Sequence, residues 1–237
     1  MILVAHQCGE DKYPRITVEA AKHSLSIGAD YAEFDIRHLK DGGLAINHDE
    51  SGTDLFGKDQ KIAETTKEEF LTWRRKYHDG YGALCLEDML DAGVSRILLH
   101  IKEGGAVLQS ILETLRRYGV EDSVLIGAQT LDDVKLAKSF NPNIRVLCFA
   151  PTSAIEEFLQ TDAEIIRVWE GKETQELVDK IHSYGKMCFI MVDNGRCGYT
   201  SEDSLRRFAA LGCDGILINH IEFAKKVLNI ERNGQTL

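Results

Sequence analysis

Short apolar runs alternate along the chain with stretches whose apolar residues recur at helical spacing. The first run is Ile2–Ala5, and Thr17–Ile27 follows it with apolar residues on one helical face and a glycine just beyond its end. Tyr31–Ile36 is the next run. After residue 93 the pattern predicts strands at Arg96–Ile101, Ser123–Ile126, Arg145–Phe149, Glu164–Val168, Met187–Val192 and Gly215–Ile218, each followed by a helix: Ala106–Tyr118, Leu131–Ser139, Ser153–Gln160, Thr174–Tyr184, Ser201–Leu211 and Ile221–Leu228.

A β-hairpin interrupts this alternation after the second predicted strand. Asp41-Gly42 lies between two apolar-containing arms, which is a hairpin-turn signal, and the second arm ends at His48-Asp49. Residues 50–93 are less regular and predict only two short helices, near Lys67–Trp73 and Leu86–Asp91. We therefore interpret 50–93 as an insertion into the regular pattern.

Eight strands, each followed by a helix, predict the fold class α/β and a single (β/α)₈ TIM barrel with a β-hairpin and a short insertion after strand two. Continuous apolar runs suit parallel strands that are buried on both faces. The repeating units use the whole chain, so we expect one domain over residues 1–237. A doubly wound open sheet is the alternative, but it usually has fewer strands, and no GxGxxG follows the first strand.

Composition and charge exclude several classes of partner. The 237 residues carry a net charge of −10, which argues against nucleic acid, an anionic membrane surface or an anionic substrate, unless a local feature reverses the field. No segment approaches the ~20 apolar residues of a membrane span, and no basic leader precedes the first apolar run, so we expect a cytoplasmic protein without stable membrane insertion. The six cysteines lack any CxxC pair and predict apolar packing rather than a zinc site.

Two acidic residues near the end of the second strand are the first candidate for chemistry. Glu33 and Asp35 are two positions apart, so both point to the same side of the strand. Such a pair is costly unless it binds a cation or shares a proton. With a third ligand from the next strand, where His100 and Lys102 share one face, they predict a site for a hard divalent cation. The alternative is a salt bridge from either carboxylate to Arg37 or Lys102.

Histidines and aromatic residues at other strand ends extend this site. His6 ends the first strand and His48 ends the hairpin arm, and two such imidazoles can act as general base and general acid. Four other histidines, His23, His38, His78 and His182, are expected to be surface or packing residues. Trp169, Phe149 and Trp73 either line a pocket or pack in the ordinary way. Arg196, after the seventh strand, is a candidate phosphate contact.

Several of these residues stand in a recurring order. The chain reads Ala5-His6-Gln7, Gly28-Ala29-Asp30, Glu33-Phe34-Asp35, Lys40-Asp41-Gly42, His48-Asp49, Leu86-Glu87-Asp88, His100-Ile101-Lys102 and Gly212-Cys213-Asp214-Gly215-Ile216-Leu217-Ile218-Asn219. This order resembles the glycerophosphodiester phosphodiesterase family, within the group that includes spider-type sphingomyelinase D. The family pattern has His-Arg-Gly, Glu-x-Asp, Lys-Asp-Gly, His-Asp, Glu-x-Lys and Gly-x-Asp-Gly-Ile-x-Thr-Asp at these places.

The departures from that family are chemically specific. Gln7 stands where the family has an arginine suited to contacting phosphate, and a glutamine offers only a weaker, neutral donor. Pro14-Arg15-Ile16 replaces Pro-Glu-Asn, so Arg15 brings a positive charge from a different backbone position. His100 replaces the third carboxylate ligand, and an imidazole ligand suits Mn²⁺ or Zn²⁺ better than Ca²⁺.

The resemblance implies a metal-dependent phosphoric diester hydrolase of lipid and glycerol metabolism, acting on a small phosphodiester. A glycerophosphodiester or a lysophospholipid headgroup would give an alcohol and a phosphomonoester, glycerol 3-phosphate for the former. Glu33, Asp35 and His100 would hold a divalent cation (Mg²⁺, Ca²⁺ or Mn²⁺), with His6 as base and His48 as acid. Substrate contacts would come from Gln7, Lys102, Arg15, Trp169 and Arg196. Two alternatives remain: a divergent barrel that forms a cyclic phosphate or acts on another ester, and an inactive ligand-binding barrel.

Overall fold

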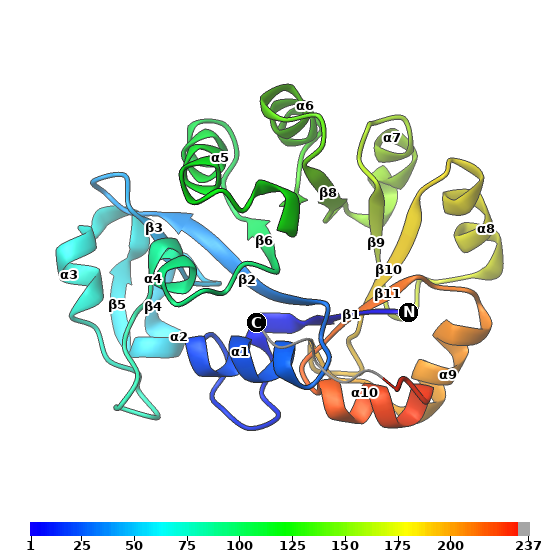
Figure 1. Cartoon of the computed structure of the whole chain (residues 1–237), viewed down its shortest axis with the longest axis horizontal. Coiled ribbons are helices and arrows are strands. Elements are labelled where there is room, and N and C mark those ends of the chain that lie inside the picture. Colours follow the sequence, from blue (N-terminus) through cyan, green and yellow to red (C-terminus); the bar gives the residue numbers. More distant parts are fainter. Residues whose placement is uncertain (232–237) are drawn as a thin grey trace.

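Parallel strands form a closed barrel in the computed structural model, which describes residues 1–231 (Figure 1). The first and last strands make the closure, since Ala5 pairs with Ile218 on one side and with Ala32 on the other. This confirms the predicted barrel. In chain order the strands are β1 (Ile2–Ala5), β2 (Tyr31–His38), β6 (Ile97–Ile101), β7 (Val124–Ala128), β8 (Arg145–Cys148), β9 (Ile165–Trp169), β10 (Met187–Met191) and β11 (Gly215–Ile218).

Helices cover the outside of the barrel, as Figure 1 shows. They are α1 (Val18–Ser26), α4 (Leu86–Asp91), α5 (Ala106–Tyr118), α6 (Leu131–Phe140), α7 (Ile155–Leu159), α8 (Gln175–Ser183), α9 (Glu202–Ala210) and α10 (Ile221–Leu228). Four of them begin where a Thr or Ser side chain accepts a hydrogen bond from a backbone N–H three residues later: Thr17, Thr130, Thr174 and Ser201. The helix predicted from Ser153 begins instead as a 3₁₀ turn over Thr152–Ala154, because Pro151 holds an extended backbone before it.

The barrel interior has its own apolar core, separate from the larger core between strands and helices. Its buried members are Val4, Leu98, Leu125, Leu147, Ile165, Phe189, Met191 and Leu217. Because side chains alternate along a strand, residues two positions beyond an inward-facing residue also point inward. The polar residues near the ends of β2, β6 and β9 therefore project into the barrel mouth.

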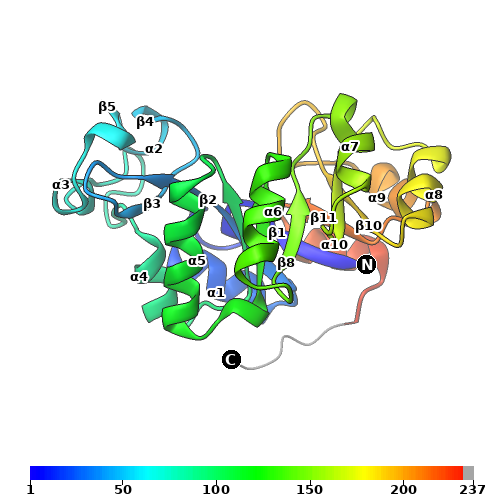
Figure 2. The same cartoon turned by 90° about the horizontal axis from the view of Figure 1, so that it is seen from above.

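The hairpin and the insertion flank one side of that mouth. β3 (Leu44–Ile46) pairs antiparallel with the last part of β2, which extends β2 to His38, beyond the predicted end. The insertion continues with β4 (Ser51–Gly52), α2 (Thr53–Phe56), β5 (Lys58–Lys61) and α3 (Lys67–Leu71), and Figure 2 shows it projecting beside the barrel. The small antiparallel β4–β5 pair was not predicted, because its strands are two and four residues long and largely polar.

Trp73 belongs to the core of the insertion and not to a pocket over the barrel. It is 3 % exposed and packs edge-on against Phe56 and Phe70. Among residues 1–231, every helix falls short of the length and apolar character that spanning a bilayer requires. The six cysteines are free thiols, and all but Cys197 are buried.

Candidate active site

Two buried carboxylates lie side by side in the barrel mouth. Tyr31, Glu33 and Asp35 share the inward face of β2, and Tyr31 packs against the inner core. Glu33 and Asp35 are each 1 % exposed. Burial and the neighbouring charge of Asp35 raise the pKa of Glu33 well above its usual value. The structure thus places two carboxyl groups together at the position that the sequence singled out.

A histidine and a lysine from β6 and its end complete this cluster. Asp35 pairs in register with His100, and one ligand atom from each of Glu33, Asp35 and His100 lies within 4.8 Å of the others. Asp35 Oδ1 is 2.9 Å from both His100 Nδ1 and Lys102 Nζ. Burial opposes ionisation of Asp35, but His100 and Lys102 outweigh it and hold its pKa below its usual range.

The predicted salt bridge and the predicted metal set therefore involve the same carboxylate. Lys102 pairs with Asp35, whereas Arg37 binds Glu103 Oε1 at 3.1 Å and is not part of the cluster. Within residues 1–231, neither oxygen of Asp35 accepts a well-aligned hydrogen bond. Two buried carboxyl groups with one imidazole beside them suit a divalent cation. The imidazole of His100 also stacks on the ring of Phe149, with 3.8 Å between the two ring centres, and this contact fixes its orientation.

His6 is held as a neutral imidazole at the end of β1. Its Nδ1 donates a hydrogen bond to Asn219 Oδ1 at 2.7 Å, because an amide oxygen can only accept. Burial lowers the pKa of His6 to about 4. The backbone of Gly198 passes so close that a Cβ there would collide with Asn219 Oδ1 and lie 2.7 Å from His6 Nδ1. This crowding leaves Nε2 of His6 as the free, proton-accepting nitrogen.

His48 has the opposite environment. Its Nδ1 lies 2.7 Å from Asp49 Oδ1, and both side chains are about half exposed. The Asp49 carboxylate accepts the hydrogen bond from Nδ1, so Nε2 is the ring nitrogen of His48 that remains for a ligand. The two histidines thus differ in the partner of Nδ1, an amide for His6 and a carboxylate for His48.

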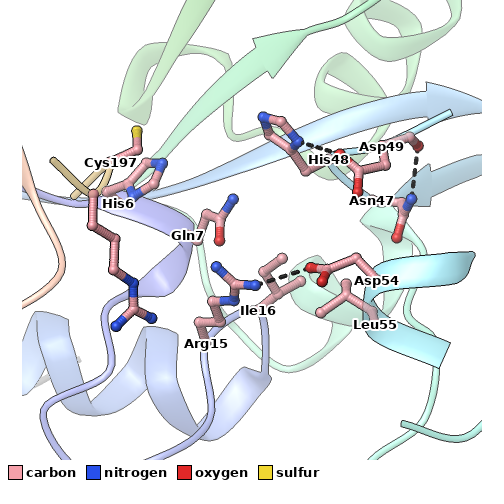
Figure 3. Close-up of a pocket in the computed structure, with 11 residues that line it drawn as sticks. His6, Gln7, Arg15, Ile16, Asn47, His48, Asp49, Asp54, Leu55 and Cys197 are labelled. Carbon is pink, nitrogen blue, oxygen red and sulfur yellow. Dashed lines mark hydrogen bonds and ion pairs between the residues drawn. The ribbon is translucent and has the colours of Figure 1, made fainter. Parts of the chain in front are cut away.

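Two cavities meet at this histidine pair. An inner cavity of about 130 Å³ is lined by His6, His48, Glu33, Asp35, His100, Lys102, Phe149, Arg167, Trp169, Met191 and Cys197. An outer cavity of about 220 Å³ adjoins the insertion and is drawn in Figure 3; it is lined by His6, His48, Gln7, Arg15, Ile16, Asn47, Asp49, Asp54, Leu55, Arg196 and Cys197. The structure thus brings the predicted site residues to one mouth but divides them between two compartments.

Both predicted arginines lie at the outer cavity and already have acidic neighbours. Arg15 Nη2 is 3.0 Å from Asp54 Oδ2, which joins the first loop to α2 (Figure 3). Arg196 Nη2 lies 4.0 Å from Glu10 Oε1, and its guanidinium stacks on Tyr199. Their charges are therefore partly compensated before any ligand binds.

The loop that carries Gln7 is strained. Gln7, Cys8 and Ile16 have positive φ angles of 49°, 70° and 56°, and such a value is a genuine outlier for the β-branched Ile16. The loop is tied together by Ile16 N–H, which donates to Gln7 O at 2.8 Å, and by Arg75, whose Nη2 donates to Ile16 O at 2.6 Å. In this conformation the backbone N–H of Gln7 points at the carboxylate of Glu33 and donates a hydrogen bond to its Oε2 at 2.8 Å. Strain of this kind is commonly found at functional sites.

Sequence reasoning missed Arg167 and the pairing role of Asn219. Arg167 lies on β9 between Ile165 and Trp169, so all three face the barrel interior. It is 5 % exposed, and burial lowers its pKa to about 10, which leaves it charged near neutral pH. The available signal was an arginine inside an otherwise apolar buried strand. For Asn219 no local signal exists, since its partner is 213 residues away.

Comparisons with known proteins point in one direction. The defining pattern of the glycerophosphoryl diester phosphodiesterase family matches residues 6–223. A glycerophosphodiester phosphodiesterase of Bacillus altitudinis is 24 % identical over 95 % of this chain and 97 % of its own. One from Caldanaerobacter subterraneus subsp. tengcongensis is 21 % identical over 98 % of each chain.

Solved structures share the fold. An Oleispira antarctica phosphodiesterase, solved in complex with the product sn-glycerol-3-phosphate, superposes with a TM-score of 0.82 at 16 % identity, covering 97 % of both chains. A glycerophosphodiester phosphodiesterase of Thermotoga maritima gives a TM-score of 0.75 at 21 % identity, covering 96 % of this chain and 98 % of that one.

Proposed function

Because this chain belongs to the glycerophosphoryl diester phosphodiesterase family, we propose that it is a metal-dependent hydrolase that converts a glycerophosphodiester into an alcohol and glycerol 3-phosphate. One observation carries the proposal. A single cavity of about 130 Å³ is lined by the carboxylates Glu33 and Asp35 and by the histidines His6 and His48. The product bound to the Oleispira antarctica phosphodiesterase supports the choice of glycerol 3-phosphate.

Glu33, Asp35 and His100 are the residues that would hold the cation, which we propose to be Mg²⁺, Mn²⁺ or Ca²⁺. When bound, such an ion polarises a phosphoryl oxygen and stabilises the charge that develops on it. Lys102 adds a fixed positive charge against Asp35. Together they would make the mouth locally positive within an acidic protein, which suits a phosphodiester monoanion.

The two histidines have environments suited to opposite proton transfers. His6 is neutral, and its Nε2 would accept a proton from the attacking water. The water oxygen forms the new bond to phosphorus, and the bond from phosphorus to the alcohol oxygen breaks. His48, supported by Asp49, would donate its Nε2 proton to the leaving alkoxide. Each turnover therefore moves one proton onto His6 and one from His48, and solvent exchange restores both.

Transfer to a neighbouring hydroxyl of the substrate is the second candidate reaction. In that case His6 would deprotonate the substrate's own hydroxyl instead of water, and the first product would be a cyclic phosphate. The outer cavity of about 220 Å³ offers room for the group that carries the alcohol in either reaction.

We also propose a cytoplasmic location, which the six free thiols support because reducing compartments keep cysteines unpaired.

Phosphorus NMR of the reaction tests this proposal. The purified protein is incubated with glycerophosphocholine, glycerophosphoethanolamine or glycerophosphoglycerol, in separate samples containing Mg²⁺, Mn²⁺ or Ca²⁺. Glycerol 3-phosphate as the first new signal is the expected result. A cyclic species that precedes any monoester would favour the transfer reaction, and no turnover with any combination would favour a ligand-binding barrel.

A further inference from the structure

The guanidinium of Arg167 is buried inside the barrel, and no carboxylate among the described residues pairs with it. The residue is 5 % exposed, and within residues 1–231 its Nε and Nη1 have no hydrogen-bond partner. Its closest support is aromatic: Cζ lies 4.4 Å from the ring centre of Trp169 and 5.5 Å from that of Phe149. Cation–π contacts offset only part of the cost of removing a charge from water. A buried guanidinium with unused donors is a site where an anionic ligand would bind favourably.

Other cations near the mouth are already paired. Lys102 lies against Asp35, Arg15 against Asp54, and Arg37 against Glu103. Gln7 brings no charge. Among the residues that the structure describes around the inner cavity, Arg167 is thus the cation whose donors are still available.

The barrel topology places Arg167 across from the carboxylates. From β2 the strand order reaches β9 after four steps in either direction, through β1, β11 and β10 or through β6, β7 and β8. Arg167 and the Glu33–Asp35 pair therefore lie on opposite walls, and both line the inner cavity of about 130 Å³. An anion in so small a space would contact both walls.

We propose that Arg167 is a substrate-binding residue that donates hydrogen bonds to the phosphoryl oxygens from the wall opposite Glu33 and Asp35. This inference rests on the proposed function in one respect, that the anion is a phosphoryl group. A guanidinium has several donors in a planar fork, which matches phosphate oxygens better than a single ammonium group does. Trp169 would hold the guanidinium plane in place.

Binding of inorganic phosphate tests the proposal directly. Isothermal titration calorimetry at saturating Mn²⁺ gives the Kd of phosphate for the wild type, Arg167→Met and Arg167→Lys, and a separate titration confirms that each variant binds Mn²⁺ as the wild type does. We expect Arg167→Met to raise the Kd of phosphate at least tenfold, the loss typical of a hydrogen bond to a charged group. Arg167→Lys should fall between the two, and it decides by the same measurement if Arg167→Met does not fold.

Arg145→Met is the matched control. Arg145 begins β8 and also faces the barrel interior, where Nη1 donates to the Tyr31 hydroxyl at 3.1 Å. It lies at the opposite end of the barrel, so its loss removes the same charge without touching the mouth. Its Kd for phosphate should stay within about twofold of the wild type, less than the loss of one neutral hydrogen bond.

Thermal unfolding separates ligand binding from a structural role. Removing a buried charge that lacks a partner relieves the cost of taking that charge out of water. Arg167→Met should therefore have a Tm equal to or above that of the wild type in phosphate-free buffer. A lower Tm with an unchanged Kd would overturn the proposal, and so would a wild type that binds no phosphate.

The outcome is independent of catalysis. If phosphate binding depends on Arg167 while no glycerophosphodiester is hydrolysed, the inference stands and the proposed function fails. If hydrolysis proceeds while Arg167→Met binds phosphate as the wild type does, the inference alone fails.

Discussion

His6 Nδ1 donates a hydrogen bond to Asn219 Oδ1 at 2.7 Å, although 213 residues separate the two in the sequence. The contact joins the end of β1 to the end of β11, the two strands that close the barrel. An amide oxygen orients the imidazole but, unlike a carboxylate, adds no full negative charge to stabilise its protonated form. Burial therefore keeps His6 neutral, and the hydrogen bond to Asn219 directs its base character to Nε2.

Asn219→Asp should raise the pKa of His6 above its present value of about 4, because a carboxylate at 2.7 Å stabilises the imidazolium. A base must be neutral to act, so the acidic limb of kcat/KM against pH should move upward by at least about one pH unit. The pH–rate profiles of the two proteins check this. Coincident profiles would exclude His6 as the group that titrates on that limb.

Glu33→Gln should stabilise the metal-free protein and remove its response to cations. The pKa of Glu33 is raised by burial and by Asp35, so the metal-free wild type loses stability as pH rises through that pKa. The amide has no such titration, and its Tm should exceed that of the wild type at alkaline pH by about 2–4 °C for each kcal/mol relieved. Calorimetry with EDTA and with Mn²⁺ measures both effects. A variant that Mn²⁺ still stabilises as strongly as the wild type would contradict Glu33 as a ligand.

His100→Glu should change which cation binds best. An imidazole suits Mn²⁺ or Zn²⁺, whereas a third carboxylate suits Ca²⁺ and adds a negative charge beside Asp35. We expect the ratio of Ca²⁺ to Mn²⁺ affinity to rise at least about tenfold, as measured by calorimetric titration. Phe149→Leu removes the stacking partner of His100 but no ligand, and it serves as the control. An unchanged ratio in His100→Glu would place His100 outside the ligand set.

His48→Ala should lower kcat by about 10²-fold or more on a substrate with an alkyl leaving group, which needs a proton to depart. The loss should shrink on the p-nitrophenyl ester of glycerol phosphate, because a nitrophenolate leaves without protonation. Steady-state rates on the two substrates check this. A loss below about tenfold on the alkyl ester would rule out the acid role.

Gln7→Met should cost less than about tenfold in kcat/KM. The side-chain Oε1 of Gln7 has no partner within residues 1–231, and the useful donor, the backbone N–H to Glu33, survives the change. A neutral amide adds at most one ordinary hydrogen bond, worth about 0.5–1.5 kcal/mol. Kinetic comparison with Arg167→Met, for which we expect the larger loss, ranks the two contacts. The reverse order would assign the phosphate contact to Gln7.

Much of the fold could be predicted because it depends on local periodicity. Apolar runs and helical spacing located the eight barrel strands, and the Asp41-Gly42 turn located the hairpin that ends at His48. The insertion was harder, since its β4–β5 pair consists of short polar strands and its core is assembled from residues far apart, such as Phe56 and Trp73.

Which side chains share a face of a strand follows from the order of residues alone. Alternation along β2 is enough to put Glu33 and Asp35 on one side, and the same rule joins His100 with Lys102. What lies opposite a face depends on closure and register, which follow from packing of the whole chain. Three relationships therefore depend on the closed barrel: Asn219 contacts His6, and Asp35 pairs with Lys102 while Arg37 pairs with Glu103. The third is that Arg167, without a counter-ion among residues 1–231, lies across the barrel from the two carboxylates.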